Sequence, residues 1–215
     1  MHRFRGGILV ILVPAIIASA ILSAILDGSR PGLSRVFKMA ASTAVIALVF
    51  VLSPERSAYL VLVIAALAAS WVGDLALSYD GRVPFVIGLV AFAGAHVAYI
   101  AAFLARSALD TVMLLVAGAA MVVFAAVVIR WLSPHRPAEL KIPIIVYVVI
   151  ISAMVATAFA THATVPDIRI PLAAVTFAAS DLFVARQRFV TPARVNRVVG
   201  LPLYFIAQTI FATTP

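Results

Sequence analysis

The chain has 215 residues, of which 65% are hydrophobic and only 11% are charged, and its mean hydropathy is +1.17. This composition excludes a water-soluble domain, which needs far less apolar sequence for its core, and predicts a polytopic membrane protein. The net charge of +8 comes from bases that stand mainly at the ends of apolar runs, which argues against a nucleic-acid-binding face. Since the chain has no cysteine, disulfides, thiolate catalysis and cysteine-ligated metals are excluded.

Apolar runs long enough to span a membrane fill almost the whole chain. A spanning helix needs about 20 apolar residues, and we place eight, at about 7–26, 33–52, 57–78, 83–105, 109–132, 142–161, 166–187 and 196–213. We therefore expect an all-α polytopic membrane protein in which residues 1–215 form a single transmembrane domain. Ala18, Ser19 and Ala20 resemble a signal-peptide cleavage site, but the first run continues to Leu26, which favours an uncleaved first helix.

The basic residues predict an orientation for these spans. Connections after the odd-numbered spans hold Arg30, Arg35, Lys38, Arg82, Arg130, Arg136, Lys141, Arg186, Arg188, Arg194 and Arg197, whereas the other side holds Arg3, Arg5, Arg56, Arg106 and Arg169. By the positive-inside rule the richer side is cytoplasmic and both termini lie outside. The alanine- and arginine-rich composition indicates a bacterium, hence the plasma membrane.

Two spans carry an aspartate, which costs roughly 2.5–3.5 kcal/mol near the middle of a membrane helix. Asp74 lies near the end of the third span, on one helix face with Ser70 and Ser78. Asp181 lies near the end of the seventh, directly after Ser180. Because odd-numbered spans run in the same direction, the two acids are expected at similar depth. For Ser70, Asp74 and Ser78, a stripe of interhelical hydrogen bonds is the alternative interpretation.

The even-numbered spans supply polar partners for these acids. The fourth places His96 and Tyr99 on one face, the eighth aligns Tyr204 with Gln208, the sixth offers Tyr147, and Lys38 opens the second. Ordinary packing remains an alternative for His96 and Tyr147, and snorkelling for Lys38. The histidines at 2, 96, 135 and 162 lack ligand spacing, so we expect no metal site.

The order Lys38, Asp74, Tyr99 recurs at similar intervals as Lys141, Asp181, Tyr204, and GDLALS resembles SDLFVA. We hypothesise an internal repeat of residues 1–108 and 109–215, forming two four-helix halves related by a pseudo-two-fold axis along the membrane normal. Such an axis would bring Asp74 and Asp181 toward each other across a shared cavity.

Five tracts of the sequence carry a resemblance to a known family: GDLAL at 73–77, FVIGLVAFAGAHVAY at 85–99, Tyr147 with Met154, FAASDLFVARQRF at 177–189 and YFIAQ at 204–208. Together they resemble the YhhN family of bacterial membrane proteins, whose animal relatives are the transmembrane protein 86 lysoplasmalogenases. The resemblance covers the chain from about residue 38 onward. It implies cleavage of the vinyl ether bond of a lysophospholipid held among membrane lipids, giving a fatty aldehyde and a glycerophospho-base without a cofactor.

The residues make chemical sense of that reaction. Vinyl ether hydrolysis begins with proton delivery to carbon, passes through an oxocarbenium ion and ends with water addition and collapse of a hemiacetal. Two carboxylates supply acid, anion and base in glycoside hydrolysis, where a similar cation forms. We therefore expect Asp74 and Asp181 to be catalytic with His96 as a relay, whichever aspartate is the acid. Substrate-binding candidates are Lys38, Ser70, Tyr99, Tyr147, Ser180, Tyr204 and Gln208, and Lys38 or the arginines flanking the seventh span would hold the phosphate.

Two other classes of function stay open on the sequence. A proton-coupled transporter or carrier of a lipid or amphiphile also uses intramembrane Asp and His residues. In a structural membrane component the acids would only lock helices together.

Overall fold

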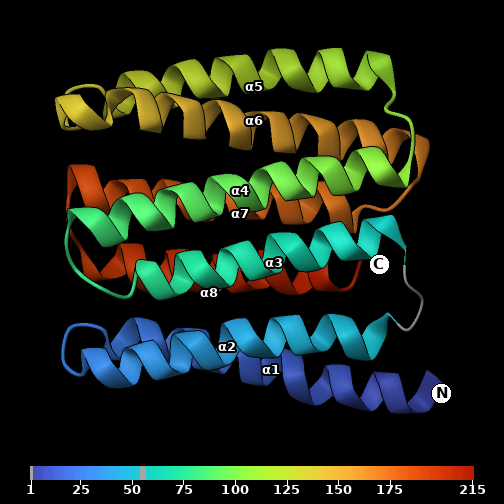
Figure 1. Ribbon diagram of the computed structural model, residues 1–215, viewed down its shortest axis with the longest axis horizontal. Coiled ribbons are helices and arrows are strands. Elements are labelled where there is room, and N and C mark those ends of the chain that lie inside the picture. The colour runs from blue at the N-terminus through green and yellow to red at the C-terminus, as the bar shows by residue number, and fades with distance from the viewer. Residues whose placement is uncertain (1, 54–56) are drawn as a thin grey trace.

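The computed structural model describes residues 2–53 and 57–215, and within these ranges it describes the side chains from Leu9 onward. These residues form helices and connections without a strand (Figure 1). The helices are α1 (His2–Leu26), α2 (Pro31–Leu52), α3 (Ala58–Ala76), α4 (Arg82–Arg106), α5 (Thr111–Leu132), α6 (Lys141–Thr164), α7 (Arg169–Ala185) and α8 (Arg194–Ala212). A 3-10 turn, η1 (Ala138–Leu140), precedes α6, and a π-helical segment, η2 (Arg186–Val190), follows α7. The predicted all-helical fold is confirmed.

Within the described residues, seven of the helices are long and apolar enough to cross a membrane. The helix outside this set is α7, which has 17 residues. It is shorter than the predicted span of 166–187 at both ends: it begins at Arg169, and its α-helical hydrogen bonding ends at Ala185, where the backbone continues as η2.

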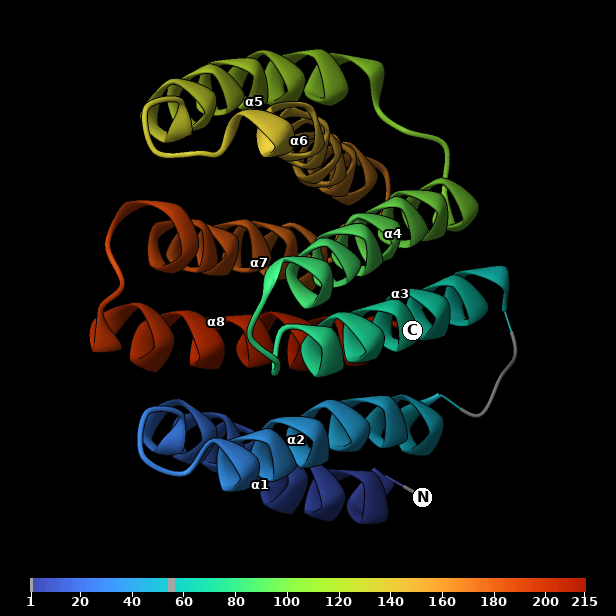
Figure 2. The same cartoon turned by 60° about the vertical axis from the view of Figure 1, so that its left-hand side comes forward.

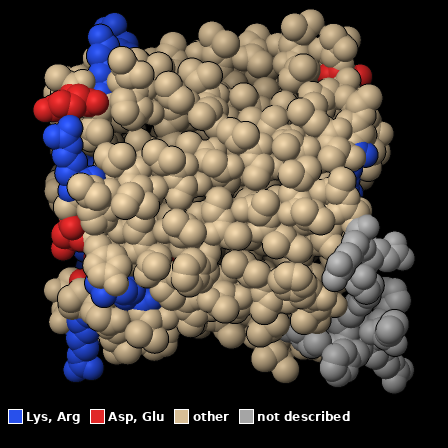
Figure 3. Space-filling model, in the orientation of Figure 1, with Lys and Arg blue, Asp and Glu red and all other residues tan. Residues whose placement is uncertain are grey.

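The helices form three layers. Two hairpins, α3–α4 and α7–α8, make up the centre, α1–α2 covers one side and α5–α6 the other (Figures 1 and 2). Successive helices run in opposite directions, so α3 and α7 end at the same end of the bundle. Most of the visible Lys and Arg side chains gather at this end (Figure 3). The basic residues at positions 3, 5 and 56, which entered the predicted orientation, lie outside the described side chains.

Glycines let the central hairpins pack closely. A Cβ atom at Gly73 of α3 would lie 2.6 Å from the Phe92 ring, and one at Gly88 of α4 would lie 2.6 Å from Leu77. In the α7–α8 hairpin, a Cβ atom at Gly200 would lie 2.7 Å from Phe183. Both hairpins therefore depend on glycine near the level of their aspartates.

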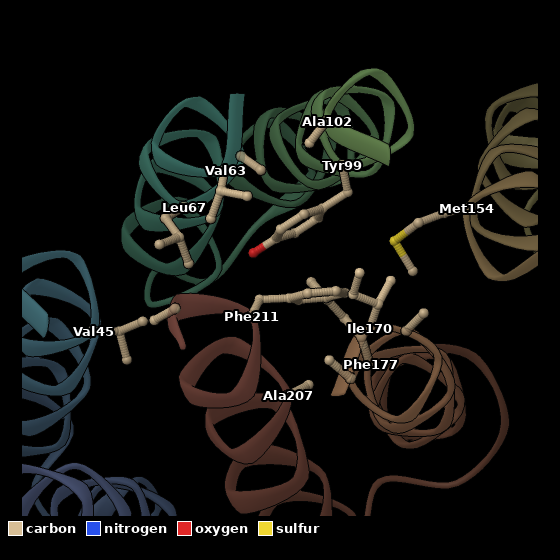
Figure 4. Packing of buried hydrophobic residues seen from close by; sticks show 14 of the residues in the cluster. Val45, Val63, Leu67, Tyr99, Ala102, Met154, Ile170, Phe177, Ala207 and Phe211 are labelled. Carbon is tan, nitrogen blue, oxygen red and sulfur yellow. The ribbon is translucent and has the colours of Figure 1, made fainter. Parts of the chain in front are cut away.

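Aromatic side chains fill the centre of the bundle between α4, α7 and α8 (Figure 4). Tyr99 and Phe211 stack with ring centroids 4.0 Å apart, and Phe177 lies edge-on to Tyr99 at 6.5 Å. All three side chains are fully buried. Since lipid tails are as apolar as this core, close packing rather than exclusion of water holds it together.

A cluster of charged groups links the end of α4, the α6–α7 connection and the C-terminal residues at the end of the bundle opposite the basic one. Arg106 donates to Asp167 Oδ2 at 3.1 Å and to the carbonyl of Thr214 at 2.8 Å. Arg169 donates to Asp167 Oδ1 at 2.8 Å and also to the carbonyl of Thr213. Partial burial acts to raise the pKa of the Asp167 carboxyl, but the hydrogen bonds and charge of Arg169, aided by Arg106, outweigh it and hold the pKa below its usual value.

Replacement of Asp167 by Asn should therefore lower stability near neutral pH, by about 1 kcal/mol, because the two arginines lose their charged acceptor. A carboxyl with a depressed folded-state pKa stabilises the fold above its unfolded pKa and loses that effect as the pH falls through the folded value. The measurement is the Tm of both proteins in detergent as a function of pH. The difference in Tm between the two proteins should be constant from pH 7 to about 5 and should shrink toward zero below about pH 4. A difference in Tm that does not depend on pH would contradict this account.

Candidate active site

A cavity of about 710 Å³ opens toward the end of the bundle at which α3 and α7 finish. Residues from all eight helices and from the α3–α4 connection line it, and both Asp74 and Asp181 are among them. From the sequence, the two acids were expected to approach each other across a shared cavity; what the structure gives is that both are among its lining residues. Each acid, however, has its own set of hydrogen-bond donors.

Asp74 is held by groups from two other helices. Its Oδ2 atom accepts hydrogen bonds from the hydroxyls of Ser42 on α2 and Tyr204 on α8, each at 2.7 Å. Lys38 Nζ lies 3.4 Å from Oδ1 and donates to the Asp74 backbone carbonyl at 3.0 Å. The Asp74 side chain is only 2% exposed. A cation and two hydroxyl donors thus offset part of the cost of burying this carboxylate.

The hydrogen bonds continue from Asp74 into the aromatic core. The Tyr204 hydroxyl accepts from Gln208 Nε2 at 3.1 Å, and Gln208 Oε1 accepts from the Tyr99 hydroxyl at 2.6 Å. This order leaves each donor in the chain with an acceptor. Tyr99 and Gln208 therefore fix the orientation of Tyr204, and neither is among the residues that line the cavity.

Asp181 has a different environment. The Tyr147 hydroxyl on α6 donates to Asp181 Oδ2 at 2.6 Å, and His96 Nε2 on α4 lies 3.4 Å from the same oxygen. Nε2 is also 3.1 Å from the Tyr147 oxygen, whereas the buried Nδ1 has no partner among the described residues. The tautomer that satisfies this geometry carries its proton on Nε2 and donates to Tyr147. The Asp181 side chain is 18% exposed, so it is the more accessible acid.

Aromatic rings stand between the two acid groups. Phe92 lies edge-on to both Tyr204 and Phe177, at 5.7 Å and 6.1 Å between ring centroids. The His96 ring lies 4.6 Å from Phe177. These rings form a continuous set of contacts from Tyr204, which binds Asp74, to His96, which lies beside Asp181. Phe92 and Tyr204 also line the cavity.

The remaining predicted site residues have simpler positions. Ser180 lines the cavity, and its hydroxyl donates to the Phe177 carbonyl at 2.7 Å. The Ser70 hydroxyl is buried without a partner among the described residues, and Ser70 does not line the cavity. Within the described part of the chain, no group of three His, Asp or Glu side chains lies close enough to hold a metal ion.

Sequence analysis missed Ser42, which shares a helix face with Lys38 four residues earlier. That spacing was the available signal, because it directs both side chains toward the same neighbouring helix. Arg35, one turn before Lys38, also lines the cavity and was not singled out.

The pairing of Lys38 with Asp74 can be tested by a double-mutant cycle. Lys38→Met should destabilise the protein by about 3–5 kcal/mol, because it leaves a buried carboxylate without its cation. Adding Asp74→Asn should restore much of that loss, since the neutral amide still accepts from Ser42 and Tyr204. The measurement is Tm in detergent for the wild type, both single variants and the double variant. Additive losses would contradict the pairing.

Comparison with known proteins shows which family this chain belongs to. Residues 33–214 match the model of the YhhN family. Two curated proteins, each named lysoplasmalogenase, from Mycobacterium bovis and Mycobacterium tuberculosis, are 37% identical to the chain over 146 residues. The match covers 66% of this chain and 54% of each relative, so the chain spans about half the length of the curated relatives it matches. No solved structure gives a significant match. The chain belongs to the YhhN family.

Proposed function

We propose that this protein is a membrane-embedded hydrolase that cleaves the vinyl ether bond of lysoplasmalogen-type lysophospholipids. The observation that carries the proposal is the presence of two intramembrane aspartates, each with its own donors, on the wall of one cavity. A purely structural acid needs only interhelical donors and has no reason to line a cavity. The lysoplasmalogenase names of the two mycobacterial relatives supply the substrate class.

The surroundings of the two acids assign them different roles. Asp181 is accessible, and no Lys or Arg pairs with it among the described residues, so it is the proton donor, oriented by Tyr147 and His96. Asp74 is almost fully buried beside Lys38 and serves as a fixed anion. Phe92 and Tyr204 also line the cavity, and aromatic rings attract a cation to their faces, which would favour a cationic intermediate.

The reaction then proceeds by protonation, addition of water and collapse of a hemiacetal. Asp181 transfers its proton to the second carbon of the alkenyl chain, and the first carbon and the ether oxygen share the resulting positive charge. Water adds to the first carbon and returns a proton to the Asp181 carboxylate. The hemiacetal collapses with proton transfer to the glycerol oxygen, which leaves as an alcohol and releases the fatty aldehyde. A single carboxyl group alternates between acid and base, as in glycoside hydrolysis.

The cavity suits an amphiphile. One side of its wall, between α5 and α6, is apolar and includes Phe124, Val128, Ile144, Val148 and Ile151. The volume falls within the range of small-molecule pockets. We propose that the alkenyl chain lies along this apolar wall while the headgroup remains at the basic end, which brings the vinyl ether to the level of the acids.

We also propose eight spans arranged as two related halves, residues 1–108 and 109–215. Asp74 on α3 is bound from α2 and α8, and Asp181 on α7 is bound from α6 and α4. Exchange of the halves converts one set of helices into the other. Side chains of α4 and α8, which correspond under this exchange, also meet: Phe92 contacts Tyr204, and Tyr99 contacts Phe211. The continuous helical backbone of α7 and η2 supports α7 as the eighth span.

The proposed setting is the bacterial plasma membrane, with the basic end of the bundle in the cytoplasm. Of the described cations, only Arg106 and Arg169 lie toward the opposite end. The positive-inside rule then places both termini outside the cell.

The function is tested by aldehyde release from an alkenyl lysophospholipid by the purified protein. The wild type should release aldehyde, and Asp181→Asn should lower the rate by at least about 10³-fold because the proton donor is lost. Tyr147→Phe should lower it by about 10-fold through a less well oriented acid. Asp110→Asn, which keeps a helix-capping side chain at the other end of the bundle, is the matched control and should retain activity. If the wild type moves the lipid across the membrane without cleaving it, the protein is a lipid carrier and this proposal is wrong.

The spans and their orientation are tested by labelling single cysteines in intact cells, because the natural chain has none. Cysteines in place of Ser29 and Thr191 should react only from the cytoplasm, and cysteines in place of Ala108 and Ile168 should react only from outside. All four positions are exposed in connections between helices, so a reagent on the correct side can reach them. Ile168 and Thr191 flank α7 and η2. Labelling of both from one side would show that this segment does not cross the membrane.

A further inference from the structure

We propose that Arg35 and Arg188 form an anion site at the mouth of the cavity, which binds the phosphate of a lysophospholipid headgroup. This inference rests on the proposed function for the identity of the ligand. From the sequence, Lys38 or the arginines flanking the seventh span were expected to hold the phosphate, and Arg188 is one of these arginines. The ammonium group of Lys38 is engaged by the side chain and carbonyl of Asp74. The two arginines differ from Lys38 in having no carboxylate partner among the described residues.

Arg35 reaches the cavity from α2. Its Nη2 atom donates to the carbonyl of Ser78 at 3.2 Å, and its guanidinium lies 3.8 Å from the centroid of the Tyr79 ring. The Nε atom is buried and has no partner among the described residues. A ring and a carbonyl thus fix the plane of the guanidinium while leaving donors unused, which is the arrangement an incoming phosphate oxygen would satisfy.

Arg188 approaches the same connection from the other half of the chain. Its Nη2 atom donates to the carbonyl of Gly81 at 3.2 Å, and the guanidinium lies 4.7 Å from the centroid of the Phe85 ring. Arg188 belongs to η2, and π-helical turns occur frequently at functional sites. The two arginines therefore bind the two ends of the Ser78–Gly81 connection, and both line the cavity.

The other charges on the cavity wall are consistent with this assignment. Arg197 is paired with Asp27, as Lys38 is with Asp74. Asp80 is exposed in the connection between the two arginine contacts. A phosphate bound to the arginines would leave Asp80 beside the amine of a zwitterionic headgroup, so the wall matches a phosphate ester that carries a cation.

The position along the bundle fits the length of the substrate. Ser78 lies just past the end of α3, four residues after Asp74, and its hydroxyl donates to the Asp74 carbonyl at 2.7 Å. A glycerol unit separates the phosphate of a lysophospholipid from its vinyl ether. A phosphate at Arg35 and Arg188 would therefore hold the vinyl ether near the level of the acids.

The test measures the binding of two ligands that have no vinyl ether bond and so cannot be cleaved. One is a saturated ether lysophosphocholine, and the other is the matching alkylglycerol without phosphate. Binding is measured for the full chain in detergent, for Arg35→Gln and Arg188→Gln, and for Arg130→Gln as a control at the same end of the bundle but outside the cavity. Each cavity variant should raise the Kd of the phosphate ligand about 10-fold, equivalent to about 1.4 kcal/mol, and leave the alkylglycerol unchanged. Arg35→Lys, which keeps the charge but not the fork, should fall between wild type and Arg35→Gln.

Each other outcome has a definite meaning. Equal weakening of both ligands, or no change in either, would overturn the anion site. Displacement of the lysolipid by inorganic phosphate at comparable concentration would overturn the headgroup as its ligand in favour of a soluble anion. Selective loss of phosphate binding in a protein that releases no aldehyde from a vinyl ether lipid would support the anion site while rejecting the proposed hydrolysis.

Discussion

The buried carboxylate of Asp74 is the constraint on which the rest of the structure depends. An ionised side chain taken out of water costs several kcal/mol unless a counter-charge and hydrogen-bond donors are supplied in place. Here Lys38 and Ser42 come from α2 and Tyr204 comes from α8. One carboxylate thus determines how three helices from both halves of the chain must meet. Gly73, directly before it, brings α3 close enough to α4 for the Phe92 ring to pack there.

The second acid uses the same layout with different chemistry. Asp181 has a tyrosine donor as Asp74 does, but a histidine takes the place of the lysine. The result is one acid fixed beside a permanent cation and one acid beside a group that can accept or donate a proton. Environments that differ in this way separate the roles of two chemically identical residues.

Much of the fold follows from the sequence, because a membrane leaves few alternatives to helices about 20 residues long. The ends of most helices were therefore predicted to within a few residues, and the polar residues within them were recognised because placing them in a membrane costs free energy. The end of α7 was not, since nothing in RQRFV marks the change to a π-helical turn at Arg186. The α-helical part of α7 was therefore overestimated at this end, and it was also overestimated at its start, because the helix begins at Arg169.

The partners of each acid were harder to predict than the acids themselves. Periodicity gives the face of a helix on which a residue lies but not the helix it meets. The hypothesis that the aspartates approach each other left out the possibility that each is satisfied separately, by Tyr204 and by Tyr147. Ser42 and Arg35 were missed because a serine inside a membrane helix and an arginine near the end of one are both common without any function.

The central claim is that the vinyl ether is held against Asp181 inside the bundle. It is tested most directly by an experimental structure with a saturated ether lysophosphocholine bound. The account predicts the ether oxygen and the first chain carbons within hydrogen-bonding reach of the Asp181 carboxyl, with the chain against α5 and α6. A lipid that occupies the cavity with its ether oxygen out of reach of both aspartates would contradict it.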